Sequence, residues 1–385
     1  MRKLFLASCL ILLVSSVILA QKHTVIALGH ADFSVNELDM ATGKILQKFT
    51  ALNQPHEAAI SPDGKTIYAS IPQAGHVVIL GATMEEKGKI ETPYFHGRTP
   101  QPPGQRGGGG QRGAAGQRGA GQRGGGQRGG EEAAAAPAAP ANPQPAGVSS
   151  PDSSSPHGMG LNTDGSKLYI GVEQADVPGV VVYDTKSNKV LKKIDLLLRG
   201  GHYLQVQPKT DKVYYPHRND NRVVVIDGKT DTIKKIIDVP GGPVGVDFAP
   251  NGEVWIHGDG SGDVEGTVAV IDSKTDTLIR TIQTPGRGAG RMAVSPDGKW
   301  AASTHSGTQD VAIIDAERKE LLVSVVIGGG PGFPMFSPDS SRLYVMVSST
   351  SEVVSIDLKT MRVVNRWKAG QSPFGGGLRY VDGRQ

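Results

Sequence analysis

The chain contains a single cysteine, Cys9, which lies in an apolar stretch near the N-terminus. A chain without a second cysteine forms no internal disulfide and no cysteine-rich metal site, so its stability has to come from its packed core. Aromatic residues make up only 5% of the chain, and the formal net charge is +4 over 385 residues. Without Arg2 and Lys3 the charge falls to +2, with 39 basic residues against 37 acidic ones. This balance argues against a nucleic-acid-binding protein.

Long hydrophobic runs are also missing, apart from the one between Leu4 and Leu19. This run follows the basic residues Arg2 and Lys3, is too short for a typical membrane span, and ends at a plausible cleavage site after Ala20. Residues 1–20 therefore resemble a secretory signal peptide, and we expect a periplasmic or extracellular protein with no transmembrane helix in the mature chain.

No long stretch has the periodicity of a helix, but strand-like segments recur. Four near-copies are rich in valine and isoleucine and end in aspartate, and these aspartates are 45, 43 and 42 residues apart. The segments are 223–227, 268–272, 311–315 and 353–357. A strand-forming unit that repeats at this period is typical of a β-propeller blade.

Two kinds of turn separate the expected strands, and each kind occurs about seven times. The first resembles Ser61-Pro62-Asp63-Gly64, and its Asp-Gly or Asn-Gly pair favours the positive φ angles of a tight hairpin. The second resembles Asp227 to Thr230, in which the side chains hydrogen-bond to their own backbone. The count predicts an all-β, seven-bladed propeller. We assign the aspartates of the second series to turns and not to paired catalytic acids.

The expected strands begin and end in the middle of a blade. Residues 23–28 are typical of a second strand and residues 377–381 of a first strand, so we expect the two ends to pair and close the ring. Residues 99–155 interrupt the repeat with Gly-Gln-Arg-Gly, Ala/Pro and Ser/Pro segments that bury too little apolar surface to fold. We expect them to form a disordered insert between two parts of the propeller, 21–98 and 156–385.

These units resemble the YVTN-type seven-bladed propeller repeats of secreted bacterial and archaeal proteins. The resemblance rests on the Ser-Pro-Asp-Gly turns, on Leu168-Tyr169 and Leu343-Tyr344 after two of the turns, and on the Val-x-Val-Ile-Asp strands. It covers the chain from about residue 23 to the end, apart from the insert. It implies kinship with surface-layer, lactonase-like and nitrite-reductase haem-domain propellers, but the shared fold does not choose among their functions.

Seven of the ten histidines fall, by register, at one mouth of the expected channel. His56, His157 and His202 begin three consecutive blades, while His30, His217, His257 and His305 lie near the ends of second strands. Arg287 and Arg291 enter the same face from another blade. We take these nine residues as candidate ligand-binding residues.

His56, His157 and His202 would converge on one metal ion or on the edge of a haem, because neutral imidazole ligates Zn, Cu, Fe and Ni. In the simpler alternative, these histidines only hydrogen-bond to loop carbonyl groups. Glu57 and Asp247 also point toward the expected channel as possible Ca²⁺ ligands, but a full set of oxygen ligands is missing. Asp259 and Asp263, in a glycine-rich loop, are typical of a plain turn.

We therefore expect a binding or scaffold protein whose ligand lies at the histidine-rich mouth. The alternatives are a metal- or haem-dependent redox protein and a metal-dependent lactonase that use the same face. The cofactor is unknown, with a transition metal or haem as candidates. The expected partner is a small molecule, a protein or an anionic polymer of the cell envelope, the last suggested by the arginines of the insert.

Overall fold

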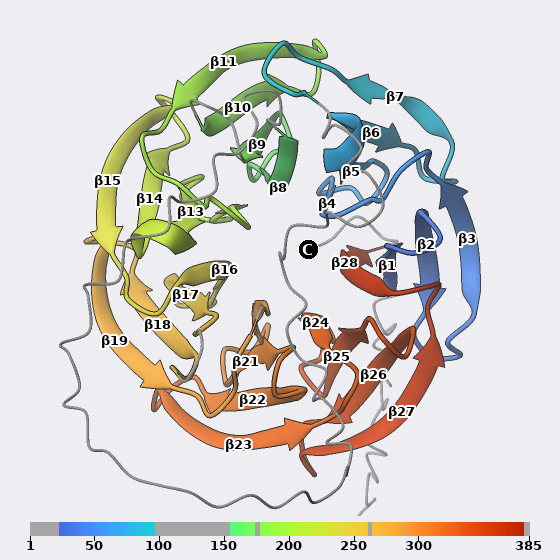
Figure 1. The fold of residues 1–385 in the computed structure, drawn as a ribbon, viewed down its shortest axis with the longest axis vertical. Coiled ribbons are helices and arrows are strands. Elements are labelled where there is room, and N and C mark those ends of the chain that lie inside the picture. The colour runs from blue at the N-terminus through green and yellow to red at the C-terminus, as the bar shows by residue number, and fades with distance from the viewer. Residues whose placement is uncertain (1–22, 97–154, 174–177, 261–263, 289, 381–385) are drawn as a thin grey trace, which may run out of the picture.

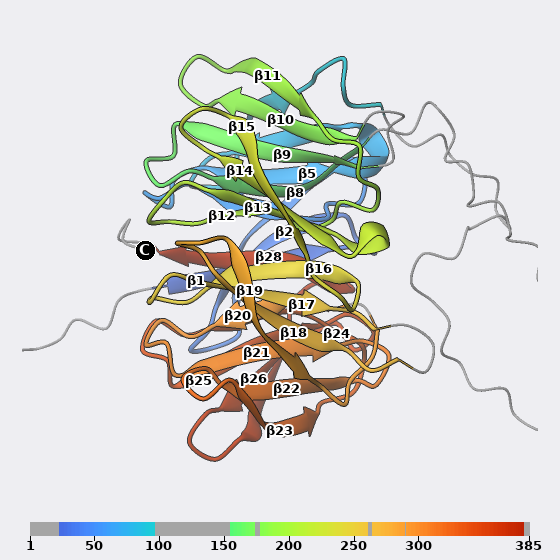
Figure 2. The ribbon, with the colours of Figure 1, turned by 90° about the vertical axis from the view of Figure 1, so that its left-hand side faces the viewer.

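The computed structural model describes residues 23–96, 155–173, 178–260, 264–288 and 290–380. These residues form seven four-stranded antiparallel sheets arranged as blades around a central axis (Figure 1), with a disc-like side view (Figure 2). The seven-bladed propeller predicted from the repeats is thus confirmed. The first strand of each blade lies nearest the axis and the fourth lies at the rim (Figure 1).

The strands follow one another from the axis outward in every blade. Blade 1 contains β28 (Pro373–Tyr380), β1 (His23–Gly29), β2 (Ser34–Asp39) and β3 (Ile45–Thr50). Blade 2 contains β4 (Ala58–Ile60), β5 (Ile67–Ile71), β6 (His76–Leu80) and β7 (Glu86–Ile90), and blade 3 contains β8 (Ser155–Leu161), β9 (Lys167–Glu173), β10 (Gly179–Asp184) and β11 (Lys189–Asp195). Blade 4 contains β12 (Gln205–Val206), β13 (Val213–His217), β14 (Arg222–Asp227) and β15 (Thr232–Asp238).

Blade 5 contains β16 (Pro243–Phe248), β17 (Glu253–Gly258), β18 (Thr267–Asp272) and β19 (Thr277–Gln283). Blade 6 contains β20 (Met292–Val294), β21 (Trp300–His305), β22 (Asp310–Asp315) and β23 (Glu320–Val326). Blade 7 contains β24 (Pro331–Phe336), β25 (Arg342–Val347), β26 (Glu352–Asp357) and β27 (Arg362–Lys368). Two 3₁₀ turns, η1 (Pro72–Ala74) and η2 (Arg218–Asp220), follow β5 and β13.

The third strand is apolar on both faces in most blades, because each sheet packs between two neighbouring sheets. An exception is β2, which carries the buried polar residues Asn36 and Glu37. In β14, residues 223–226 are fully buried, and Val224 belongs to a core cluster that also contains Val180 and Val182 of blade 3. The rim strand β15, by contrast, is exposed along most of its length. The repeated Val-x-Val-Ile segments suit this stacking, because burial of each large apolar side chain stabilises the fold by about 1.5–3 kcal/mol.

The Ser-Pro-Asp-Gly turns join first and second strands and form hairpins stabilised by their own side chains. The Ser295 hydroxyl donates to the Asp297 carboxylate at 2.7 Å and accepts the backbone N–H of Trp300 at 2.9 Å. Gly298 has a φ of 74°, and Ser340, at the same position of blade 7, has a φ of 56°. The predicted positive φ is therefore present even where glycine is absent.

The Asp-x-x-Thr turns join third and fourth strands on the same face of the disc. Asp227 accepts the backbone N–H groups of Lys229 at 2.9 Å and Thr230 at 3.1 Å, which is the turn role expected from the sequence. The next residue, Asp231, has a φ of 52°.

Some of these turns also bind neighbouring blades together. Tyr169 of blade 3 donates to the Asp231 carboxylate of blade 4 at 2.7 Å, and Lys167 bonds to the same carboxylate at 2.8 Å. Tyr214 of blade 4 bonds in the same way to Asp276 of blade 5 at 2.7 Å. In blades 3 and 4, the tyrosine after the first turn thus links its blade to the next one.

Pairing between β28 and β1 closes the ring, as the sequence predicted. The pairs run from His23 opposite Tyr380 to Leu28 opposite Gly375. The C-terminal strand is longer on its N-terminal side than expected, since it begins at Pro373, while residue 381 lies outside the described residues.

Arg379 strengthens this closure with a buried ion pair. Its guanidinium lies 2.7 Å from the Glu37 carboxylate on β2 and donates to the backbone oxygens of Gly64 at 2.7 Å and Ala82 at 2.9 Å. A single side chain therefore joins the C-terminal strand to blade 1 and to the turns of blade 2.

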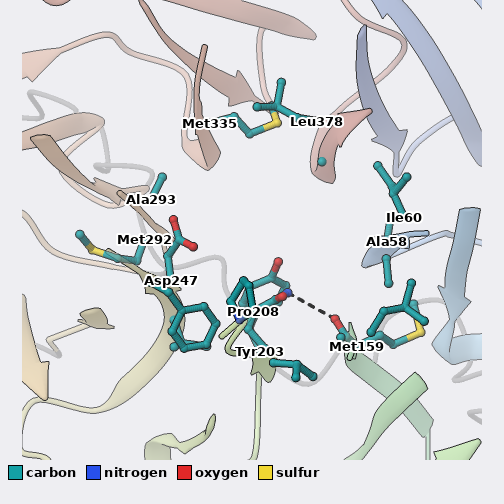
Figure 3. A pocket seen from close by; sticks show the side chains of 18 of the residues that line it. Ala58, Ile60, Met159, Tyr203, Pro208, Asp247, Met292, Ala293, Met335 and Leu378 are labelled. Carbon is teal, nitrogen blue, oxygen red and sulfur yellow. Dashed lines mark hydrogen bonds between the residues drawn. The ribbon is translucent and has the colours of Figure 1, made fainter. Parts of the chain in front are cut away.

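The inner strands surround an axial cavity of about 370 Å³ (Figure 3). The signal peptide expected at 1–20 and residues 99–154 of the expected insert lie outside the described residues, and Ser155 begins β8. No helix in the described ranges combines the length and the apolar character needed to cross a bilayer.

Candidate functional site

Four of the predicted histidines form a continuous row at one mouth of the channel. His30 follows β1, His56 precedes β4, His157 lies in β8 and His202 precedes β12, so each comes from one of four consecutive blades. The centroids of neighbouring rings are 5.2, 4.3 and 4.4 Å apart along this order. We call these four residues the histidine row.

Backbone hydrogen bonds hold the row in place. The N–H of His56 bonds to the Ser70 carbonyl at 2.9 Å, and the N–H of His202 bonds to the Pro216 carbonyl at 3.0 Å. Each histidine at the start of an inner strand is therefore fixed to the second strand of its own blade. The repeat itself thus gives these side chains a common register.

The row lies against an apolar wall; His157 is buried, and His30, His56 and His202 are half-buried. The Phe374 ring is 4.9 Å from His30 and 5.4 Å from His56. Burial, together with the nearby charge of His56, lowers the pKa of His30 to about 3. Burial also holds the pKa of His202 well below its ordinary value, with His157 and Arg291 adding to the effect. At neutral pH these two imidazoles are uncharged.

A buried ion pair crosses the channel beside the row. Glu57 precedes β4 of blade 2, Arg291 precedes β20 of blade 6, and Arg291 Nη2 lies 2.6 Å from Glu57 Oε1. Both side chains are almost fully buried, and the guanidinium also lies over the rings of Tyr203 at 5.3 Å and Phe374 at 5.4 Å. Burial acts to raise the pKa of Glu57, but Arg291 and then His56 outweigh it and lower that pKa to about 2.

This ion pair lies between the histidine row and the axial cavity. Ala58 and Met292, which directly follow Glu57 and Arg291, line the cavity, whereas the members of the pair do not. The channel is therefore divided into a polar mouth and an apolar lower part.

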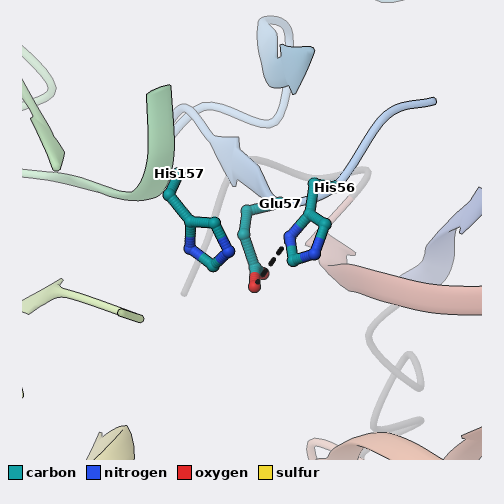
Figure 4. Close-up of side chains that lie close together, drawn as sticks. All are labelled: His56, Glu57 and His157. Carbon is teal, nitrogen blue, oxygen red and sulfur yellow. Dashed lines mark ion pairs between the residues drawn. The ribbon is translucent and has the colours of Figure 1, made fainter. Parts of the chain in front are cut away.

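The closest group of possible metal ligands consists of His56, Glu57 and His157 (Figure 4). One ligand atom from each of them lies within 4.8 Å of the others. His56 Nδ1 is 3.5 Å from Glu57 Oε1, and Glu57 Oε2 is buried with no hydrogen-bond partner within the described ranges. His157 Nε2 also lies 3.7 Å from the Glu173 carboxylate.

This group differs from the predicted triad of His56, His157 and His202. His202 contacts the ring of His157 at the end of the row, while Glu57 occupies the position between the other two histidines. From the sequence, Glu57 is expected only as a calcium ligand, and its pairing with Arg291 is missed. The register does contain a signal, because opposite charges at one position of blades 2 and 6 face each other across a seven-bladed ring.

The other predicted histidines lie apart from this group. His217 is buried against Tyr215, with ring centroids 4.6 Å apart, and burial lowers its pKa to about 4. His257 and His305 form a separate pair with centroids 5.5 Å apart. His257 bonds to Ser303 at 2.7 Å, which ties this pair into blade 6.

The remaining candidates have more local roles. Arg287 is partly exposed in the loop before β20, and its backbone N–H bonds to Thr308 at 3.0 Å. Asp259 bonds to His257 at 3.1 Å and pairs with Arg218 at 3.3 Å, while Asp263 lies outside the described residues. Asp247 faces the axial cavity, on the other side of the ion pair from the histidine row.

Among the comparisons with known proteins, only the one with solved structures finds similar proteins, and it supports the fold. No protein-family model matches the chain, and no curated protein matches its sequence. Hydrazine synthase of Kuenenia stuttgartiensis is similar in structure, with a TM-score of 0.62 and 17% identity over 83% of this chain and 88% of that one. A functionally unknown protein of Desulfotomaculum acetoxidans DSM 771 has a TM-score of 0.65 and 12% identity over 93% and 99%. Dihydro-heme d1 dehydrogenase NirN in complex with DHE has a TM-score of 0.54 and 12% identity over 94% and 75%.

Proposed function

We propose that this propeller is a binding protein that holds a divalent transition-metal ion at the channel mouth. The ligands are His56, His157 and Glu57, and the carrying observation is that their donor atoms lie within 4.8 Å of one another. Two imidazoles and one carboxylate suit Zn²⁺, Cu²⁺, Ni²⁺ or Fe²⁺ better than the oxygen-loving Ca²⁺ or Mg²⁺.

The distances require only a modest adjustment on binding. Ligand atoms around a tetrahedral zinc ion, with bonds of about 2.0–2.2 Å, lie roughly 3.4 Å apart. Rotation of the imidazoles of His56 and His157 about their side-chain bonds would close the remaining gap. Glu57 can keep Arg291 on Oε1 and offer Oε2, the atom without a hydrogen-bond partner.

The surroundings of the ligands also suit a metal site. A carboxylate near a ligating histidine orients the ring and raises its basicity, and Glu173 lies 3.7 Å from His157 in this position. His202, in ring contact with His157, provides a further imidazole at the edge of the site. The site would therefore accept an ion together with an exchangeable ligand from the solvent.

Titration of the metal-free protein with Zn²⁺ tests this proposal. We expect one tight site per chain, and we expect His56→Ala and His157→Ala each to weaken binding at least about 100-fold. His76→Ala is the matched control, because His76 is partly buried on the third strand of blade 2 and bonds to the carbonyl of Ala74. Equal affinity in all four proteins would refute the assignment of the ligands.

A haem-dependent redox protein is the second candidate for the same mouth. Two structural neighbours are a hydrazine synthase and a dihydro-heme d1 dehydrogenase. In this chain, the support is the row of imidazoles beside Phe374. Haem added to the protein should then shift its Soret absorption band. Such a shift in the wild type, absent in His157→Ala, would favour this function. Turnover of a lactone by the metal-loaded protein would instead favour a lactonase.

A further inference from the structure

The axial cavity on the far side of the ion pair has properties of its own. Its volume of about 370 Å³ is in the range of pockets that hold small organic ligands. It extends from the Arg291–Glu57 pair toward the turns between first and second strands, since Pro62, Pro208 and Pro296 of those turns line it. The cavity thus approaches the face of the disc opposite the histidine row.

One carboxylate projects into this cavity. Asp247 lies on the inner strand β16, and Figure 3 shows its carboxyl group directed toward the centre of the channel. One carboxylate oxygen accepts the backbone N–H of Val294 at 2.7 Å, a bond that holds the group in this orientation. Asp247 forms no ion pair with any residue that the structure describes.

The rest of the cavity wall is mainly apolar and aromatic. Met159, Tyr203 and Met335 lie around the channel together with Asp247 (Figure 3), and Phe248 and Phe333 also line the cavity. Aromatic faces and methionine sulfur attract the polarised hydrogens of an ammonium group as well as the hydrocarbon attached to it. Asp247 is the only formally charged side chain on the wall formed by the described residues.

From this arrangement we propose that the axial cavity is a second binding site, for a small organic monocation in which a protonated amine is attached to an apolar body. The ammonium group would donate hydrogen bonds to the Asp247 carboxylate, and the apolar body would fill the space between the methionine and aromatic side chains. A carboxylate in an apolar cavity is costly unless it is paired, and a cationic ligand supplies the missing partner. This site is independent of the metal proposed at the mouth.

Three probes of similar shape and different charge test the proposal on the unmodified full chain. Phenethylamine is cationic, 2-phenylethanol is neutral and 3-phenylpropionate is anionic, and calorimetric titration at neutral pH measures each of them. We expect the amine to bind about 10- to 100-fold more tightly than the alcohol and the acid to bind least. Similar affinities for all three, or no binding of the amine up to about 10 mM, would overturn the proposal.

Two variants locate the site. Asp247→Asn keeps the shape of the side chain and is expected to lower the affinity for phenethylamine to the level of 2-phenylethanol. His157→Ala, at the mouth, is expected to leave the affinity for the amine unchanged. Amine binding that survives Asp247→Asn but disappears in His157→Ala would place the amine at the mouth and refute the cavity site. Because the three-probe comparison uses the unmodified protein, it decides the matter even if a variant folds poorly.

Discussion

The buried ion pair between Arg291 and Glu57 should contribute strongly to the stability of the propeller. Replacement of Arg291 by methionine removes the guanidinium of a side chain that is 2% exposed and leaves the buried Glu57 carboxylate without its cation. Breaking a buried pair by removal of one partner typically costs about 3–5 kcal/mol. We therefore expect Arg291→Met to lower the free energy of unfolding by this amount, because blades 2 and 6 lose their direct link across the channel.

Urea denaturation followed by circular dichroism measures the effect, and two further variants interpret it. The double variant Arg291→Met/Glu57→Met carries no unpaired charge and should recover to within about 1–2 kcal/mol of the wild type. Lys48→Met is the control, since it breaks an ion pair with Asp32 in which the lysine is 45% exposed, and should cost at most about 1 kcal/mol. A loss in Arg291→Met no larger than in Lys48→Met, or a double variant less stable than either single one, would refute the reasoning.

Three further predictions concern closure, blade contacts and pH. Arg379→Met should lower the free energy of unfolding by about 3–5 kcal/mol, because it leaves the buried Glu37 carboxylate without its cation. Deletion of residues 377–385 should lower the melting temperature sharply, and an unchanged melting curve would contradict closure through β28. Tyr169→Phe should cost about 1–3 kcal/mol in urea denaturation through loss of its bond to Asp231, and a neutral effect would mean that this contact adds nothing to blade stacking. Burial raises the pKa of Asp247 from 3.8 to about 6, so the native state binds this proton more tightly and stability falls as pH rises from about 4 to 6. Asp247→Asn should therefore stabilise the protein by up to about 3 kcal/mol at pH 7 and have little effect at pH 4, and equal effects at both values would contradict the shift.

The sequence predicted the architecture because the architecture depends on local, repeated chemistry. Strands such as 223–227 are apolar on both faces because they lie between two sheets, and the same pattern recurs in most blades. The carboxylate of the turn aspartate Asp227 accepts the backbone N–H groups of Lys229 and Thr230, so its role follows from residues next to it in the chain. The register of first strands was also sufficient to bring His56, His157 and His202 to one mouth.

The finer geometry of the site depends on contacts between blades, which no local pattern specifies. Glu57 and Arg291 are 234 positions apart in the chain, and their contact depends on the diameter of the channel. His257 lies near the end of a second strand on the same face as the row, yet its ring bonds to Ser303 of the next blade. His217 instead packs against Tyr215 of its own strand. Side-chain packing determines these orientations, and the period of the repeat does not specify it.

The metal site is tested most directly by electron paramagnetic resonance of the full-length protein loaded with Cu²⁺. Hyperfine coupling to nitrogen counts the imidazoles bound to copper. We expect a single class of Cu²⁺ with at least two imidazole nitrogens in the wild type, one fewer in His56→Ala and in His157→Ala, and no change in His76→Ala. A spectrum of loosely bound copper, or one that neither mouth variant alters, would contradict a metal site at this channel mouth.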